Sequence, residues 1–194
     1  MYRQLAAALA PFLLLAQMAS IAQADDSRLY LAASMGFSLP DALVSGVEAE
    51  SGTNGDFGGA VGVQTSDIFR WDIAEAHFVN FNGVDLGFGA SRSSVSLGTA
   101  LNWGLFESDN RYKPYVSLGL GTARLRYLSN ATGQMDDDWA FEWNLGGGVD
   151  FVSTEDFRAG IRYRYRRSNR NTDGVDYGMR AHSVSLEIAY LGGP

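Results

Sequence analysis

The chain of 194 residues contains no cysteine and only 4 prolines. The lack of cysteine means that no disulfide holds the fold together, and it excludes thiolate metal sites and cysteine nucleophiles. Glycine, by contrast, is abundant, with 23 residues. A chain that is rich in glycine and aromatic residues, poor in proline, and exported without helical spans points toward a β-barrel.

Long apolar runs are missing beyond the N-terminus. A helix that spans a bilayer needs about 18 or more consecutive apolar residues, and no segment after residue 24 reaches that length. Yet hydrophobic residues make up 46% of the chain. The closed β-barrel is the other structure that satisfies its backbone in lipid, so the composition favours a barrel.

Residues 1–24 have the features of a secretory signal peptide. Arg3 supplies a positive charge, residues 5–15 form a short apolar segment, and residues 22–24 (AQA) form a cleavage site of the A-x-A type. The apolar segment is too short for a membrane anchor, and two acidic residues follow the cleavage site at once. We expect an exported protein whose mature domain spans residues 25–194.

Positive charge is in short supply. The chain has 15 Lys and Arg against 22 Asp and Glu, and removal of Arg3 with the signal peptide leaves 14 against 22, a net charge of −8. Nucleic-acid phosphates require Lys and Arg, so this balance excludes a nucleic-acid partner.

Apolar and polar residues alternate with a period of two through most of the mature chain, as in strands that have one apolar face. Residues 157–166 (FRAGIRYRYR) alternate most clearly, because every second side chain from Arg162 to Arg166 is a guanidinium. The pattern predicts eight strands, at residues 29–38, 57–64, 69–73, 95–105, 114–127, 139–151, 157–166 and 183–190. In the fifth strand the apolar face changes near Thr122, which predicts a bulge there.

The predicted connections fall into two classes. Those after the odd strands are long (39–56, 80–92, 128–138 and 168–180), and those after the even strands are short (65–67, 107–113 and 153–155). Long loops at one end and short turns at the other are typical of an outer-membrane barrel, in which both termini lie on the periplasmic side.

Alternation alone leaves open which face points inward. A soluble barrel of the lipocalin type, which would bind a ligand in the periplasm, would have its apolar face inside. Eight strands, however, leave an interior only just wide enough for side chains, and the apolar faces carry bulky residues such as Trp71, Trp103 and Phe141 while the polar faces are rich in Gly, Ser and Ala. We therefore predict that the apolar face meets lipid.

Aromatic residues support this orientation. Trp and Tyr prefer the membrane–water interface, although strands favour aromatic residues in any setting. The predicted aromatic girdle consists of Trp71, Trp103, Tyr115, Trp139, Trp143, Tyr163, Tyr165 and Tyr190.

Four segments resemble the family of small outer-membrane barrels that includes opacity-type and OmpA-like proteins: 113–121 (KPYVSLGLG), 144–151 (NLGGGVDF), 161–165 (IRYRY) and 181–186 (AHSVSL). The resemblance covers essentially the whole mature chain. It implies an all-β, eight-stranded, antiparallel up-and-down transmembrane barrel and no particular chemistry. One departure is that the chain continues past Tyr190, whereas such barrels usually end on an aromatic residue that assembly factors recognise.

The inward face carries most of the ionisable groups. Buried charges must be paired, because an unpaired one costs several kcal/mol. We therefore expect a charge network that fills the lumen, and the alternative is a narrow ion path lined by arginines. The network is predicted to consist of Arg70, Asp72, Glu142, Asp150, Arg158, Arg162, Arg164, Arg166 and Glu187.

Catalytic and metal-binding signals are weak. A hydrolase needs a nucleophile beside a base, but His182 and Ser183 are neighbours on a strand and face opposite sides, and His77 has only Glu75 at the matching spacing. Residues 136–138 (DDD) fall in a predicted loop, where they would either bind a divalent cation that bridges lipopolysaccharide or be solvated. We predict no catalytic residue, cofactor or metal.

The sequence therefore predicts a non-enzymatic outer-membrane barrel with a structural or surface-interaction role. Alternatives are a lipid-modifying enzyme in the same barrel, similar to lipid A deacylases, and a small-pore channel. Expected partners are outer-membrane lipid and lipopolysaccharide, the barrel-assembly machinery, and an extracellular ligand bound through the long loops.

Overall fold

The computed structural model describes residues 27–44, 47–50, 52–85, 89–105, 112–129, 135–154, 156–172 and 175–192. The predicted signal peptide lies outside the described residues. Within these ranges no helix has both the length and the apolar character that crossing a membrane would require.

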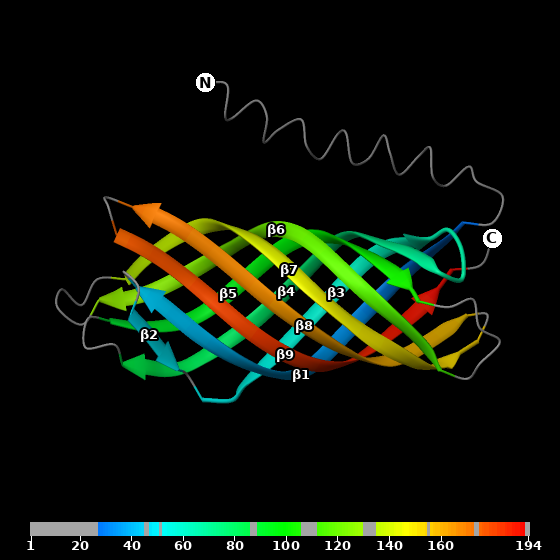
Figure 1. Cartoon of the computed structure of the whole chain (residues 1–194), viewed down its shortest axis with the longest axis horizontal. Coiled ribbons are helices and arrows are strands. Elements are labelled where there is room, and N and C mark those ends of the chain that lie inside the picture. Colours follow the sequence, from blue (N-terminus) through cyan, green and yellow to red (C-terminus); the bar gives the residue numbers. More distant parts are fainter. Residues whose placement is uncertain are drawn as a thin grey trace, which may run out of the picture.

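Strands account for nearly all of the described chain. They are β1 (Arg28–Val44), β2 (Val47–Glu50), β3 (Asn54–Gln64), β4 (Phe69–Asp85), β5 (Gly89–Gly104), β6 (Lys113–Ser129), β7 (Met135–Ser153), β8 (Phe157–Thr172) and β9 (Val175–Leu191). Eight of them pair antiparallel in chain order, and β1 pairs with β9 to close the ring, while β2 pairs with the end of β1 (Figure 1). The predicted closed, eight-stranded antiparallel barrel is confirmed.

β1 begins and β9 ends at the same end of the barrel (Figure 1). We call this the terminal end; residues 65–68 between β3 and β4, residue 105 after β5 and residue 154 after β7 also lie there. The opposite end, which carries β2, is called the far end.

The strands are strongly tilted. Tracing paired residues once round the wall from Ala33 leads back to Leu43, ten residues further along β1. Closing a sheet of eight strands with this stagger requires a tilt of about 40° relative to the barrel axis. Because the barrel has only eight strands, its interior is narrow and side chains can fill it.

The apolar faces point outward. Phe37 is 69% exposed and Leu31 is 63% exposed, whereas Arg162 is 4% exposed. The predicted orientation is confirmed, and the alternative of a soluble barrel with an apolar interior is wrong. The reason is volume, since the bulky apolar side chains have room only on the outside.

The strands are longer than the alternation predicts. β1 continues to Val44, β4 to Asp85 and β8 to Thr172, so most of the residues predicted as long loops are strand. The alternation stops because a strand beyond the hydrocarbon needs no apolar face, whereas its backbone hydrogen bonds can continue. Hydropathy therefore marks the lipid-facing part of each strand and not its end.

The predicted bulge at Thr122 is wrong. β6 pairs without a shift on both sides at this residue, and its inward positions continue through Ala123, which is fully buried. One bulge among the described residues lies in β4, where Ile73 is an extra residue against β3, and Ile73 and Ala74 together oppose Thr99 of β5. Polar residues such as Arg124 are outward in β6 because that part of the strand lies beyond the apolar band.

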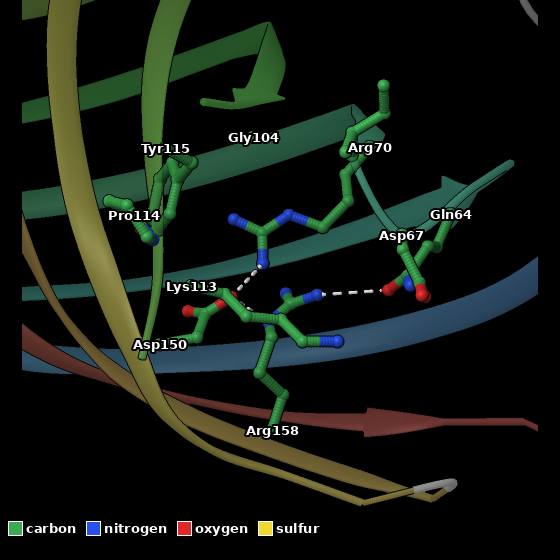
Figure 2. A pocket seen from close by; sticks show the side chains of 10 residues that line it. Gln64, Asp67, Arg70, Gly104, Lys113, Pro114, Tyr115, Asp150 and Arg158 are labelled. Carbon is green, nitrogen blue, oxygen red and sulfur yellow. Dashed lines mark hydrogen bonds and ion pairs between the residues drawn. The ribbon is translucent and has the colours of Figure 1, made fainter. Parts of the chain in front are cut away.

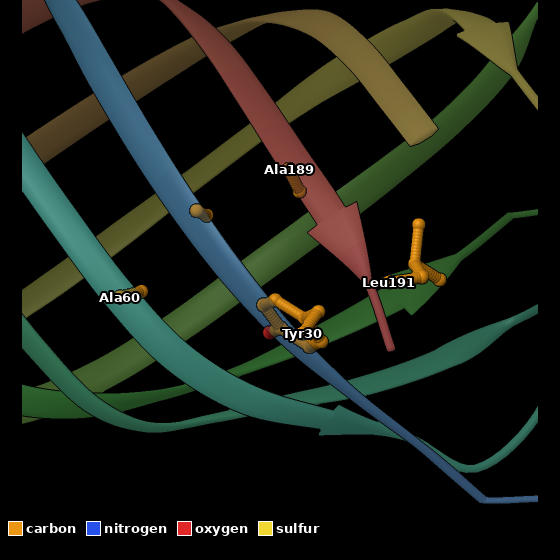
Figure 3. Close-up of a cluster of buried hydrophobic side chains, with 5 residues drawn as sticks. Tyr30, Ala60, Ala189 and Leu191 are labelled. Carbon is orange, nitrogen blue, oxygen red and sulfur yellow. The ribbon is translucent and has the colours of Figure 1, made fainter. Parts of the chain in front are cut away.

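Small residues line the wall at the terminal end of the lumen. Ala32, Ala60 and Ala189 come from β1, β3 and β9 and are buried, as is Tyr30 among them (Figure 3). Alanines keep the inner wall thin here, so the large ring of Tyr30 fits inside the barrel.

Candidate functional site

The barrel lumen holds the main cluster of ionisable side chains. All nine residues predicted for the charge network lie inside and are buried: Arg70, Asp72, Glu142, Asp150, Arg158, Arg162, Arg164, Arg166 and Glu187. They reach the lumen because alternate residues of β4, β7, β8 and β9 point inward.

Asp150 binds two arginines near the terminal end. Its Oδ2 accepts a hydrogen bond from Arg70 Nη1 at 2.8 Å and lies 3.4 Å from Arg158 Nε (Figure 2). Arg158 also donates to Gln64 Oε1 at 3.3 Å, and the guanidinium of Arg70 lies 4.4 Å from the ring centroid of Tyr115. The aromatic ring thus supplies a cation–π contact to Arg70 in addition to its bond with the carboxylate.

These groups nearly fill the lumen at this level. The pocket between them has a volume of about 30 Å³ and is bordered by Lys113 and Asp67 at its rim (Figure 2). A water molecule needs about 10–15 Å³ of such volume. The pocket therefore has room for two or three waters.

Arg162 is the centre of the next level. It donates to Glu187 Oε2 at 2.7 Å, to Asp72 Oδ2 at 3.1 Å, to Asn102 Oδ1 at 2.8 Å and to Ser117 Oγ at 3.1 Å. These acceptors come from β9, β4, β5 and β6, so one side chain of β8 joins five strands across the lumen. Hydrogen bonds to both carboxylates offset the cost of burying the guanidinium.

Arg164 lies two residues closer to the far end along β8 than Arg162 and forms the next level of contacts. Its Nη2 donates to Glu75 Oε2 at 2.8 Å, and its Nη1 contacts His77 Nε2. Asn144 donates to Glu75 Oε1 at 3.2 Å. Glu75 therefore receives hydrogen bonds on both carboxylate oxygens.

Arg166 and Asp56 form the ion pair nearest the far end. His77 Nδ1 lies 3.7 Å from Asp56 Oδ1 and links this pair to the level of Arg164. Ser96 donates to Glu142 Oε2 at 3.0 Å. Among the described residues, five buried arginines pair with five carboxylates, and His77 lies between two of these: Arg70, Arg158, Arg162, Arg164 and Arg166; Asp56, Asp72, Glu75, Asp150 and Glu187. Glu142 is buried beside them and accepts from Ser96.

The sequence reasoning missed three ionisable members and their polar partners. Asp56, Glu75 and His77 lie in stretches treated as loop or left unassigned, since β3 was predicted to begin at residue 57 and β4 to end at 73. The signal that reveals them is the alternation of Glu75 and His77 with alanines, out of phase with Arg70 and Asp72 because of the bulge. Other missed contributors are Tyr30, Ser96, Asn102, Ser117 and Asn144.

One residue of the predicted girdle lies on the other side of the wall. Tyr115 is 5% exposed and faces the lumen, because it shares the inward phase of Ser117 and not the outward phase of Val116. A strand end does not by itself decide which way a residue points. The other seven lie on the outward face: Trp71, Trp103, Trp139, Trp143, Tyr163, Tyr165 and Tyr190.

The geometry around the two histidines is unlike that of a hydrolase. His182 is on the outward wall and Ser183 is buried in the lumen, where its hydroxyl donates to the backbone oxygen of Arg164 at 3.4 Å. His77 Nε2 lies 3.5 Å from Glu75 and in contact with Arg164. A Cβ atom built on Gly58 would lie 2.8 Å from Ser34 Oγ and also close to the His77 ring, so a serine lies near His77 in the lumen. No hydrogen bond between a serine and either histidine is found among the described residues.

No group of three or more His, Cys, Asp or Glu in the described part of the chain has a geometry that fits a metal ion. The side chains of residues 136–138 lie outside the described residues, and the suggested cation site there stays a prediction.

Comparison with known proteins bears on the fold. The family model of the outer membrane protein beta-barrel domain matches residues 6–190. No curated protein matches the chain. The solved structure of Neisserial surface protein A (NspA) has 15% sequence identity and a TM-score of 0.64, covering 84% of this chain and 96% of that one.

Two further solved barrels are similar at lower TM-scores. The N-terminal β-barrel domain of OprF from Pseudomonas aeruginosa has 14% identity, covers 82% of this chain and 97% of that chain, and has a TM-score of 0.47. Ail from Yersinia pestis has 14% identity, covers 81% and 97%, and has a TM-score of 0.44. At such low identity the likeness to solved structures shows the fold alone, and here it rests on NspA.

Proposed function

Because the chain belongs to the outer membrane protein beta-barrel domain family, we propose that it is a closed, non-enzymatic barrel whose far end makes contacts at the cell surface. Its partners in this proposal are outer-membrane lipid and lipopolysaccharide, the barrel-assembly machinery, and an extracellular ligand. The terminal end faces the periplasm and the far end faces the outside.

The single observation that carries the proposal is the ion-paired lumen. At each level from Asp150 to Asp56 an arginine donates directly to a carboxylate across the barrel interior. Ion conduction requires a hydrated path or a row of weakly held sites. Direct arginine–carboxylate contacts supply neither, and this favours a plug over a channel lined by arginines.

The length of the strands supports a role at the surface. About 9–11 residues suffice for a tilted strand to cross the bilayer, whereas β7 has 19 residues and β9 has 17. The excess lies at the far end, since the apolar band begins near the terminal turns. It extends the hydrogen-bonded wall of the barrel beyond the apolar band.

Conductance tests the closed lumen. The purified barrel in a planar bilayer should give no stable current steps, whereas the variant R162A/R164A, which removes two guanidinium groups from the middle of the lumen, should conduct. Steady single-channel currents from the unmodified protein would contradict the closed lumen and support the small-pore alternative. A plug variant that folds but stays silent would show that other groups close the lumen, against our assignment of the arginines.

Orientation is accessible because the chain has no native cysteine. Gly52 lies exposed at the far end and Asp67 lies exposed at the terminal end, so each offers a single labelling position. A membrane-impermeant maleimide should label G52C on intact cells, and D67C only after the outer membrane is opened. The reverse pattern would invert the proposed orientation.

Lipid chemistry tests the non-enzymatic role. The separation of His182 from Ser183 by the barrel wall speaks against the deacylase alternative, since a triad needs both groups in contact. Lipid A from cells that overproduce the protein should have the same acylation pattern as lipid A from cells that lack it. A loss or gain of an acyl chain would establish an enzyme.

A further inference from the structure

Three successive outward rows on the wall of β7, β8, β9 and β1 change from apolar to charged. The first row is Gly147, Tyr163, Val184 and Phe37; the second is Leu145, Tyr165, His182 and Leu39; the third is Trp143, Arg167, Arg180 and Asp41. Each row lies two residues closer to the far end than the row before it. The third row therefore marks the border at which the apolar band ends.

Two arginines face each other in the third row. Arg167 and Arg180 are directly opposite across β8 and β9, and both point outward because their strand neighbours, such as Arg166 and Met179, are buried inside. Like charges directly opposite on one face of a sheet are destabilising. Asp41 flanks Arg180 on the side away from Arg167, so an anion placed between the two guanidinium groups would offset their repulsion.

Aromatic side chains lie beside this pair, mainly on its terminal-end side. The hydroxyl of Tyr163 and Nδ1 of His182 are 2.8 Å apart, and the rings of Tyr165 and His182 have centroids 4.9 Å apart. Trp143 packs edge-on against Tyr165, and their ring centroids are 5.5 Å apart. Aromatic residues of this kind lie at the level of lipid headgroups, and these rings hold each other in place.

We propose that this face is a binding site for a lipid with a phosphorylated headgroup, of the kind that anchors lipopolysaccharide. The phosphate oxygens accept hydrogen bonds from Arg167 and Arg180, the sugar of the headgroup lies against Trp143 and Tyr165, and acyl chains follow the apolar rows below. Guanidinium groups suit phosphate because they present paired donors. The site lies in the outer leaflet if the far end faces the outside, so its biological role rests on the proposed function.

A second observation repeats the combination on the adjoining wall. Arg124 of β6 lies opposite Trp139 of β7, with both side chains outward and near the far end. A basic residue beside an aromatic one, four residues closer to the far end along β7 than Trp143, extends the surface on which phosphorylated headgroups can lie.

The test measures lipid retention by the folded barrel in detergent, where membrane orientation plays no part. Native mass spectrometry would quantify binding of bisphosphorylated lipid A to the unmodified protein and to R167Q/R180Q. Loss of about 1.5 kcal/mol or more per charged hydrogen bond corresponds to at least tenfold weaker binding for each arginine. The control R28Q removes an arginine of the terminal end, which pairs with Asp156, and should bind as the unmodified barrel does.

Matched ligands distinguish binding of the whole phosphorylated lipid from binding of its phosphate alone or of its unphosphorylated part. Lipid A stripped of both phosphates should bind the unmodified protein as weakly as bisphosphorylated lipid A binds R167Q/R180Q, and inorganic phosphate at millimolar concentration should not displace the intact lipid. Displacement by phosphate alone would reduce the site to a simple anion site, and equal binding to R167Q/R180Q and the unmodified barrel would overturn the proposal. Heat-modifiable gel migration confirms that each variant is folded. Cysteine labelling tests the proposed orientation independently of these results.

Discussion

Tyr30 of β1 reaches past β3 and donates its hydroxyl hydrogen to the carboxylate of Asp72 on β4. The space for this contact is provided by Gly62 of β3, where a Cβ atom would lie 2.5 Å from Cζ and from the hydroxyl oxygen of Tyr30. The charged network is thus tied to the first strand by a contact that only glycine permits.

Substitution of Gly62 by alanine should destabilise the barrel. The added methyl group would clash with the backbone oxygen of Trp71 and with the Tyr30 ring, whose bond to Asp72 would be disturbed. Overpacking of this kind costs about 1–3 kcal/mol. Urea unfolding of the refolded protein in lipid vesicles would measure the loss. The matched control is G52A, because nothing lies within 4 Å of a Cβ at Gly52; equal stability of the two variants would contradict the close contact.

Removal of the central guanidinium should be among the most costly changes in the lumen. R162M leaves the carboxylates of Asp72 and Glu187 buried without the arginine that both accept from, and breaking a buried pair from one side costs about 3–5 kcal/mol. Unfolding in urea would again give the value. Adding D72N and E187Q to R162M should restore part of the stability, because the two carboxylates left without Arg162 are then neutral. If this triple variant is no more stable than R162M, packing and not charge dominates at Arg162.

The sequence predicted the lipid-spanning part of the fold well because lipid acts on every second residue. Hydrocarbon outside and a narrow lumen inside impose opposite requirements on the two faces. The alternation in residues 157–166 therefore predicts both the strand and which of its side chains face the lumen. The same logic placed Arg162 and Glu187 in the lumen, since no charged side chain there could face lipid.

The parts that sequence reasoning could not reach lie where this constraint is absent or interrupted. Beyond the apolar band, residues such as Arg170 and Asn171 continue as strand through backbone hydrogen bonds that carry no hydropathy signal. Tyr115 was placed with the lipid-facing aromatics because its type and its position near a strand end suit the interface, although its phase is that of Ser117. Partners across the lumen, such as Arg166 and Asp56, depend on the stagger of the barrel, which a single sequence does not state.

A charge placed on the lipid-facing surface should destabilise the barrel more strongly the deeper it lies in the bilayer. Leu186 is outward and lies in register with Ile161 and Met35, well inside the apolar band. L186R should cost about 2–4 kcal/mol, as expected for a charge near the bilayer midplane.

The control for depth is N169R, since Asn169 is exposed on β8 beyond the arginine row. It should cost less than about 1 kcal/mol, the value typical of the interface. Folding stability in vesicles of defined thickness would compare the two variants. If both substitutions cost the same, the surface around Leu186 would not be in hydrocarbon.

The bulge in β4 leads to a prediction about deletions. Ile73 is the extra residue against β3, and it shares the position opposite Thr99 of β5 with Ala74. A chain without Ile73 has Asp72 and Glu75 inward with Ala74 between them, in regular alternation. Thr99 donates to the backbone oxygen of Asp72 at 2.7 Å and accepts from Trp71 Nε1 at 2.7 Å, which ties the bulge to β5. Deletion of Ile73 should therefore weaken the barrel but leave its register intact.

Deletion of one residue from a regular strand should have a different outcome. Removing Leu118 from β6, which pairs without a shift around this residue, turns every later side chain of the strand to the other face. Heat-modifiable migration should persist for the Ile73 deletion and disappear for the Leu118 deletion. The opposite result, or loss of folding in both, would mean that Ile73 is required for closure of the wall, because the barrel would then need the local bend that the extra residue introduces.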